Sequence, residues 1–169
     1  PSNTGTFMAR DTTDQTPISS VQELTDYLAA GNKPKERFRI GTEHEKFVFF
    51  RKDNSPVPYF GEASISALLK GLQAKSGWEP ILDGDNIIGL GEQSGMGAIS
   101  IEPGGQFELS GAPLENIHQT CKESNQHLAQ VREIAEPMGI GFLGIGGSPT
   151  WTYAETPHMP KSRYEIMTS

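Results

Sequence analysis

Apolar and polar residues alternate along residues 39–50, a pattern typical of a β-strand. Because successive side chains of a strand point to opposite faces, Glu43 and Glu45 share one face, roughly 7 Å apart. Phe47 and Phe49 continue the same face. A buried pair of acids needs a cation or a shared proton. A solvated strand face is the alternative interpretation, but the change from acidic to aromatic residues favours a carboxylate cluster at the mouth of a core.

A second strand pattern, residues 99–111, is interrupted by Pro103-Gly104-Gly105. Proline and paired glycines within a strand usually mark a bend or bulge that re-aims the neighbouring side chains. This predicted bend lies between two carboxylates, Glu102 and Glu108, and the strand resumes over residues 106–109. A plain exposed turn is the alternative interpretation of the same residues.

Helical spacing occurs in two stretches before this bend. Ser20 is a good N-cap, and Glu23 three residues later completes a capping box for a helix that ends at Gly31. Its apolar stripe consists of Val21, Leu24 and Leu28. A second helix is predicted because four apolar residues fall at i, i+3, i+4 and i+7, on one face that can pack on a sheet. These residues are Ile65, Leu68, Leu69 and Leu72.

The longest predicted helix has Pro113 in its first turn and stops at Pro137. Its apolar stripe consists of Leu114, Ile117, Cys121, Leu128, Val131 and Ala135. Because Cys121 lies on this stripe, we expect a buried, inert thiol that labels slowly. His118 and His127 fall off the stripe, and we expect both to be solvated.

The remaining apolar runs are short and strand-like. Residues 78–90 predict a hairpin with its turn at residues 83–86, and residues 91–97 a flexible link. A glycine-interrupted strand is expected over residues 140–145, followed by a long loop over residues 146–161. Short strands joined by brief turns favour an antiparallel meander over βαβ units. The sequence therefore predicts an α+β fold, an antiparallel sheet with helices on one side.

Composition narrows the class of protein. The 169 residues suffice for one domain, and the formal net charge of −7 argues against nucleic acid or an anionic membrane as partner. A single cysteine excludes an intrachain disulfide and fits a reducing compartment. Without a signal peptide or an apolar run of ~20 residues, we expect a soluble, cytoplasmic protein. Residues 1–16 are polar and aperiodic, which predicts a disordered lead-in before a domain over residues 17–169.

Four carboxylates are the candidate chemistry. Carboxylates without a cluster of cysteine and histidine select hard cations such as Mg²⁺. The four could gather on one concave face if their two strands are neighbours, and would then bind the Mg²⁺ that neutralises the phosphates of ATP. The predicted metal-binding and catalytic residues are Glu43, Glu45, Glu102 and Glu108.

Three motifs occur in a recognisable order: residues 41–47 (GTEHEKF), 102–113 (EPGGQFELSGAP) and 159–167 (MPKSRYEIM). Together they strongly resemble the glutamate–cysteine ligase family of plants and many proteobacteria, over about residues 17–167. The resemblance implies a glutamine-synthetase-like catalytic fold, with an antiparallel sheet curved around the active site. It also implies that Mg·ATP phosphorylates the γ-carboxylate of glutamate, after which the α-amine of cysteine displaces phosphate to give γ-glutamylcysteine, the first step of glutathione biosynthesis.

The resemblance also assigns substrate-binding residues. The matching family segment lies at the amino-acid site, so Arg163 is expected to bind a glutamate carboxylate through two parallel hydrogen bonds. Gln106 and Lys161 are further candidates for the same neighbourhood. The chain departs from the family pattern over residues 147–150, which we expect to loosen that loop.

Family members continue well beyond residue 169, so the resemblance implies the N-terminal portion of a ligase catalytic domain. Much of the nucleotide site would then lie in the further portion, and we expect the 169 residues alone to bind Mg²⁺ weakly without measurable ligase activity. Two alternatives stay open: a non-catalytic fragment or binding module, and a related γ-glutamyl ligase with another amine acceptor. The expected ligands are glutamate, cysteine and ATP, in a plastid if the source is a plant. No oligomeric state is predicted.

Overall fold

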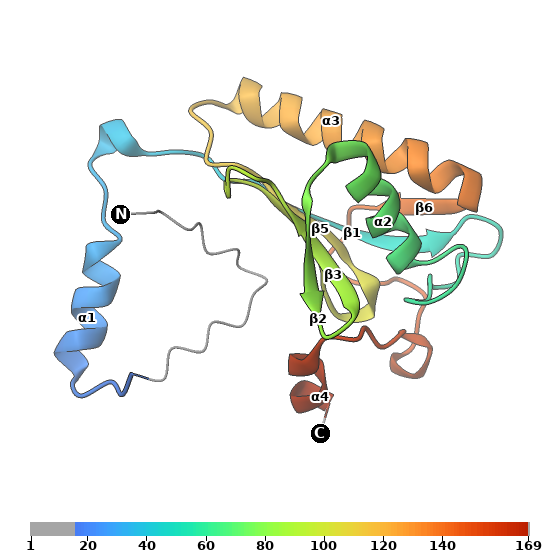
Figure 1. Ribbon diagram of the computed structural model, residues 1–169, viewed down its shortest axis with the longest axis horizontal. Helices are drawn as coiled ribbons and strands as arrows, with labels where there is room; N and C mark the ends of the chain where they lie inside the picture. Colours follow the sequence, from blue (N-terminus) through green and yellow to red (C-terminus); the bar gives the residue numbers. More distant parts are fainter. Residues whose placement is uncertain (1–15, 169) are drawn as a thin grey trace.

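The computed structural model describes residues 16–168, which form an antiparallel sheet of six strands with helices packed against it (Figure 1). Across the sheet the strands are β2 (Glu79–Asp83), β3 (Asn86–Gly91), β4 (Ala98–Ile101), β5 (Phe107–Ser110), β1 (Glu43–Phe50) and β6 (Ile140–Leu143). Every neighbouring pair is antiparallel, so the α+β class and the meander from β2 to β5 are confirmed. The lead-in predicted over residues 1–16 lies outside the described residues, apart from Thr16.

Strand β1 is first in the sequence but lies between β5 and β6. Its first half pairs with β5, where Glu45 lies opposite Glu108, and its second half pairs with β6. The strand is shorter than predicted because regular pairing begins at Glu43. Ile40 makes only an isolated bridge, donating its N–H to the carbonyl of Leu114 at 2.7 Å.

Helices α2 (Ile65–Ser76) and α3 (Ile117–Ala135) lie together over one face of the sheet (Figure 1). The N–H of Ala67 donates to the hydroxyl of Ser64 at 3.1 Å, which caps the start of α2, and Gly77 in the left-handed conformation ends it. All four predicted apolar residues of α2 are buried in the core, which confirms this helix and its packing face. They are Ile65, Leu68, Leu69 and Leu72.

Helix α3 differs from its prediction at both its start and its buried face. Asn116 caps it through a capping box with Gln119, so Pro113 lies outside the helix. The fully buried residues are Thr120, His127, Val131 and Ala135. Cys121 is exposed and His127 is buried, so both of those predictions were wrong, whereas His118 is exposed as expected. The buried face is rotated relative to the predicted stripe, and on it the His127 ring stacks on Phe107 of β5, with 6.5 Å between ring centroids.

Helix α1 (Val21–Ala30) stands beside the sheet and buries none of its residues (Figure 1). Ser20 caps it by accepting from the N–H of Glu23 at 3.2 Å, and it ends before Gly31 as predicted. Its apolar stripe faces solvent, since Val21 is 79% and Leu28 74% exposed. The sequence pattern of α1 therefore determines a helix but not a packing partner.

The remaining elements are short. Four 3-10 turns lie within the described chain, at Lys35–Arg37, Pro103–Gly105, Glu136–Met138 and Tyr153–Glu155. The predicted flexible link is a hydrogen-bonded turn, in which Glu92 donates its N–H to the carbonyl of Gly97 at 2.9 Å. Helix α4 (Ser162–Thr168) was not predicted.

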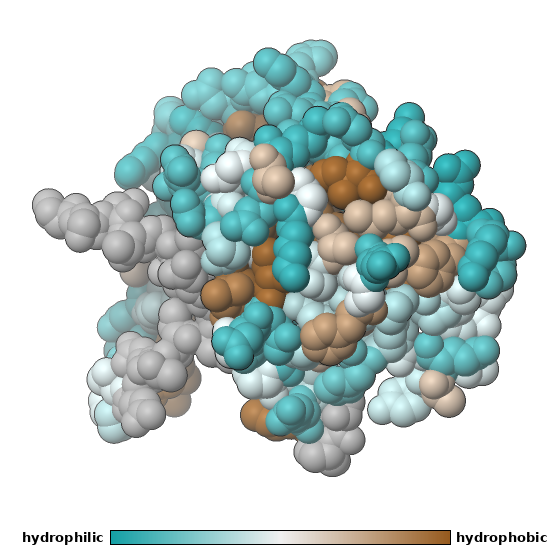
Figure 2. All heavy atoms as spheres, turned by 45° about the vertical axis from the view of Figure 1, so that its right-hand side comes forward, coloured by the Kyte–Doolittle hydropathy of each residue, from teal (hydrophilic) through white to brown (hydrophobic). Residues whose placement is uncertain are grey.

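On the face shown in Figure 2, hydrophilic residues lie around a few groups of apolar residues. Among residues 16–168, none of the helices combines the length and the hydropathy that a membrane crossing requires.

Candidate functional site

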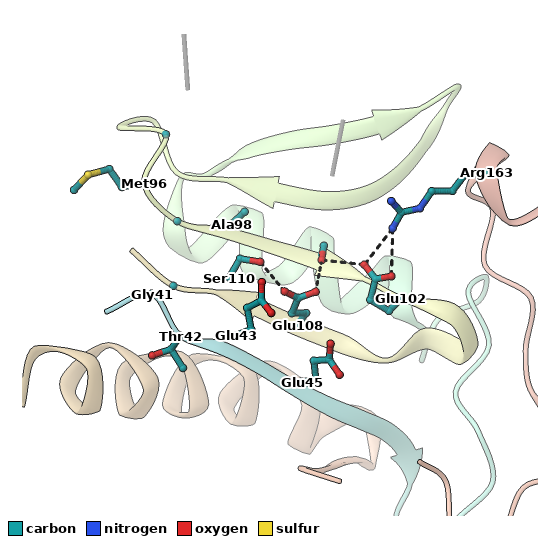
Figure 3. Close-up of a pocket in the computed structure, with 14 residues that line it drawn as sticks. Gly41, Thr42, Glu43, Glu45, Met96, Ala98, Glu102, Glu108, Ser110 and Arg163 are labelled. Atoms are coloured by element: carbon teal, nitrogen blue, oxygen red, sulfur yellow. Dashed lines mark hydrogen bonds and ion pairs between the residues drawn. The ribbon is translucent and has the colours of Figure 1, made fainter. Parts of the chain in front are cut away.

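The carboxylates lie on the sheet face that points away from α2 and α3 (Figure 3). Strand pairing sets them in rows: Glu45 lies opposite Glu108, which lies opposite Ser100, and Glu43 lies opposite Ser110 in the next row of that face. Because alternate residues share a face, these side chains line one cavity of about 550 Å³. The cavity is also lined by Glu102 and Arg163, so the four predicted carboxylates are brought together as expected.

The bend between β4 and β5 gives Glu102 its place on the cavity wall. Gly104 and Gly105 have φ of 74° and 78°, a conformation that favours glycine. Both glycines are buried, and a Cβ on Gly105 would lie 3.3 Å from Ile65 and from Met159. Glu102 closes the bend by donating its N–H to the carbonyl of Gln106 at 2.8 Å. The exposed-turn alternative is therefore wrong.

Glu108 is held by hydroxyl groups. Ser110 donates to one of its carboxylate oxygens at 2.7 Å and Ser100 to the other at 3.2 Å (Figure 3). Within residues 16–168, no lysine or arginine lies within ion-pair distance of Glu108. The carboxylate is thus oriented by neutral donors and has no ion-pair partner among residues 16–168.

Glu102 has a different environment, rich in cations. Arg163 donates from Nη2 to both carboxylate oxygens at 3.3 and 3.4 Å, and Lys161 donates to Oε1 at 3.4 Å. The hydroxyl of Tyr164 lies 2.9 Å from Oε2. Arg163 lines the cavity, but Lys161 is buried behind Glu102 and is not part of the cavity wall.

Glu43 and Glu45 are the exposed carboxylates of the cavity. Gln106 Nε2 donates a hydrogen bond to Oε2 of Glu45, so this predicted substrate-binding residue contacts a carboxylate of the site. Exposure allows water to screen the repulsion between the two acids. The predicted pair is therefore open to solvent rather than buried.

The donor set fits Mg²⁺ by chemistry, since Mg²⁺ is bound by one or two carboxylates together with waters and substrate phosphates. Three of the four carboxylates carry no ion pair from the described residues. In residues 16–168, however, no three acidic, histidine or cysteine side chains already converge closely enough to hold a metal ion. The cavity is therefore an open acidic wall, and its role in binding a metal stays a prediction.

A buried cation beneath this wall was missed by the sequence reasoning. Lys46, only 1% exposed, points to the helix-covered face and donates to the carbonyl of His44 at 2.6 Å. Burial lowers the pKa of Lys46 to about 8, although the nearby carboxylates of Glu108 and Glu45 raise it. The alternation along β1 already contained a signal, because it places Lys46 on the face opposite Glu45.

His127 lies close to this lysine. Burial lowers the pKa of His127 to about 3, and the charges of Lys46 and His44 act in the same direction. Burial is also the main cause that lowers the pKa of His44. The imidazole of His127 is therefore neutral at pH 7.

The acidic face becomes aromatic further along β1, as the alternation predicted. Phe47 and Phe49 line a separate cavity of about 210 Å³ together with Trp151. The rings of Phe47 and Trp151 meet edge to face at 5.6 Å, and Trp151 donates from its indole nitrogen to the carbonyl of Asn54 at 2.8 Å. This pocket lies on the carboxylate side of the sheet and is distinct from the main core.

Comparisons with known proteins agree with the motifs. Residues 39–169 match the sequence model of the family described as Glutamate-cysteine ligase family 2 (GCS2). Over 146 residues, 86% of this chain, the identity is 57% to the chloroplastic glutamate–cysteine ligase of Medicago truncatula, 56% to that of Nicotiana tabacum and 54% to that of Arabidopsis thaliana. The matched part covers 28%, 27% and 27% of those three proteins. The chain thus spans little more than a quarter of the length of these relatives.

Proposed function

We propose that a full-length protein containing this segment joins glutamate to cysteine. The proposal follows from the family, because this chain belongs to glutamate–cysteine ligase family 2. ATP phosphorylates the γ-carboxylate of glutamate, and the α-amine of cysteine then displaces phosphate to form γ-glutamylcysteine. This is the first step of glutathione biosynthesis. The substrates are thus glutamate, cysteine and ATP, with Mg²⁺ as the metal.

The observation that carries this proposal is one cavity lined by four carboxylates from the paired strands β1 and β5 and the bend before β5. Glu43, Glu45, Glu102 and Glu108 are the residues that would hold Mg²⁺. The metal would supply charge neutralisation for the transferring phosphoryl group. Ser100 and Ser110 would keep the Glu108 carboxylate oriented, because each donates to a different oxygen of it. Gln106 would do the same for Glu45.

Arg163 is the proposed ligand of a glutamate carboxylate. Its guanidinium lies on the cavity wall beside Glu102, at the opposite end of the acidic wall from Glu43 (Figure 3). A planar guanidinium binds a carboxylate through two parallel hydrogen bonds, which fixes the orientation of the substrate as well as its charge. Such positioning supplies much of the catalysis of phosphoryl transfer.

The sheet would form part of a larger catalytic fold of the glutamine-synthetase type. Residues 17–169 would supply its N-terminal portion, with the acidic wall as one side of the site. The chain matches 28% and 27% of the length of two relatives, which supports its being one portion of a larger protein. The names of those relatives specify the chloroplast, which supports a plastid location for this protein as well.

The test replaces Glu45 by Gln in a protein of full family length that carries this segment. Product formation and phosphate release are measured with glutamate, ATP and Mg²⁺, once with cysteine and once with other amines. We expect cysteine-dependent γ-glutamylcysteine formation that falls at least ~100-fold in Glu45→Gln, because a proposed ligand of the metal that stabilises transition-state charge is lost. Glu136→Gln, an exposed carboxylate beyond the end of α3, is the matched control and should retain activity.

Two outcomes would contradict the proposal. Phosphate release that depends on another amine and not on cysteine would assign a different γ-glutamyl ligase activity. Binding of substrates without turnover would assign a non-catalytic module. The 169 residues alone are expected to show no measurable ligase activity, since they contain only one side of the site.

A further inference from the structure

Residues 159–164, at the end of the long loop and the start of α4, are anchored to the bend beside Glu102. Three of their side chains, Met159, Lys161 and Tyr164, are each at most 4% exposed. Met159 lies against the bend, with its Cε 3.3 Å from the position of a Cβ on Gly105. A segment that is far away in the sequence therefore forms the wall behind Glu102.

The ammonium of Lys161 makes all its contacts inside the protein. It donates to the carbonyl of Ile101 at 2.6 Å, to the hydroxyl of Tyr164 at 3.3 Å and to Glu102 Oε1 at 3.4 Å. A lysine ammonium has three hydrogens, so three acceptors satisfy it. A buried charge must be paired and hydrogen-bonded, and the carboxylate of Glu102 provides that pairing. A side chain that is 2% exposed offers no surface to a substrate.

Tyr164 contacts the second carboxylate oxygen of Glu102. Its hydroxyl lies 2.9 Å from Glu102 Oε2 and accepts a hydrogen from Lys161. The phenol hydroxyl has one hydrogen, which it can donate to Glu102 Oε2 or to the carbonyl of Ile101 at 3.2 Å, and the oxygen of Glu102 is the nearer acceptor. Each oxygen of Glu102 thus has a buried partner from the same segment.

We propose that Lys161 and Tyr164 are positioning residues that fix the Glu102 carboxylate in the acidic wall, and that Lys161 does not bind substrate. This inference rests on the proposed function, because it assigns Glu102 to the Mg²⁺ site. It replaces the substrate-binding role that the resemblance suggested for Lys161. Carboxylates that bind metals depend on such hydrogen-bonding partners, whose loss costs about 10–100-fold in metal affinity or activity.

The test uses Lys161→Met and Tyr164→Phe in a protein of full family length that carries this segment. The Mg²⁺ concentration that gives half-maximal activity is measured together with the KM for glutamate. We expect the Mg²⁺ requirement to rise about 10-fold or more in Lys161→Met and by a smaller factor in Tyr164→Phe, with the KM for glutamate changed by less than about threefold. Lys75→Met is the matched control, since it removes a lysine that pairs with Glu133 at 2.7 Å outside the cavity.

A second measurement separates positioning from a general loss of structure. In a Glu102→Gln background, adding Tyr164→Phe should change activity little, because residues that act through one group have non-additive effects. Tyr164→Phe keeps the buried ring, so it removes one hydroxyl without opening a cavity. An additive loss would overturn the proposal, and so would a raised KM for glutamate with an unchanged Mg²⁺ requirement. An unmodified protein that makes no γ-glutamylcysteine would instead refute the proposed function.

Discussion

The two faces of the central strands β1, β5 and β4 differ in what they bury. On the helix-covered face, Phe107 and Leu109 are fully enclosed in the core. On the other face, Glu45 and Glu108 line the open cavity. Both faces follow from one period-two alternation, so Phe107 and Leu109 in the core are the immediate chain neighbours of Glu108 in the site. The side chains that stabilise the fold and those that line the site therefore differ in the face of the sheet to which they point, not in their distance along the chain.

The largest expected difference between the two faces is the stability that is lost when a side chain is shortened. Phe107→Ala should lower the free energy of unfolding by about 3–5 kcal/mol, because it leaves a cavity in a close-packed core. Its ring is fully buried and meets Phe142 at 5.8 Å. Urea unfolding followed by circular dichroism measures the change.

Ser110→Ala is the control on the cavity face of the same strand. It removes only a hydroxyl from a half-buried position and should cost at most ~1 kcal/mol. If the two variants lost equal free energies of unfolding, the cavity face would contribute to stability as much as the core face, and the comparison would be wrong.

A smaller effect on stability is expected from His127, a titratable side chain buried in the core. His127 has its pKa lowered to about 3, so between pH 6.5 and pH 3 the unfolded chain binds a proton that the folded chain does not. Its contribution makes the folded state less stable as the pH falls, by about 1.4 kcal/mol per pH unit, or ~2 kcal/mol at pH 5. His127→Leu should therefore reduce the loss of stability between pH 7 and pH 5.

His118→Leu makes the same change at an exposed position of α3 and should leave the pH dependence as it is. Unfolding curves at pH 7, 6 and 5 give the comparison. A His127→Leu protein that loses stability on acidification as steeply as the unmodified chain would show that this imidazole titrates normally.

The smallest expected effect concerns the cysteine. Cys121 is exposed on α3, with the amide of Asn125 donating to its sulfur at 3.4 Å. Cys121→Ser should change the free energy of unfolding by less than about 0.5 kcal/mol. A thiol reagent should modify the single thiol of the folded protein at close to the rate at which it modifies a cysteine in a free peptide. Slow labelling of the folded protein would restore the buried interpretation that the helix stripe first suggested.

Local periodicity predicted the features that depend on one segment at a time. Alternation found the shared face of Glu43 and Glu45, and the 3.6-residue spacing found α2 with its four core residues. The bend between Glu102 and Glu108 followed from the backbone freedom of two glycines. These signals are properties of adjacent residues and need no knowledge of distant partners.

Features that depend on a distant partner could not be predicted in this way. The buried face of α3 includes His127, whose ring stacks on Phe107 of β5, so the assignment of this polar side chain to the solvent face was wrong. The direction of Lys161 depends on Glu102 and on a carbonyl of β4, both about 60 residues earlier. The apolar stripe of α1 has the correct spacing but stays exposed, because spacing does not specify a partner.

The central place of β1 has a consequence for the order of events on the ribosome. β1 is made first, but its neighbours β5 and β6 lie much later in the chain. Synthesis at ~5–20 residues per second delays the arrival of β5, roughly 60 residues later, by several seconds. During this time β1 has two unpaired edges and exposed apolar side chains, which are features that promote aggregation. The acidic wall can therefore form only after β5, which carries Glu108, has been synthesised and can pair with β1.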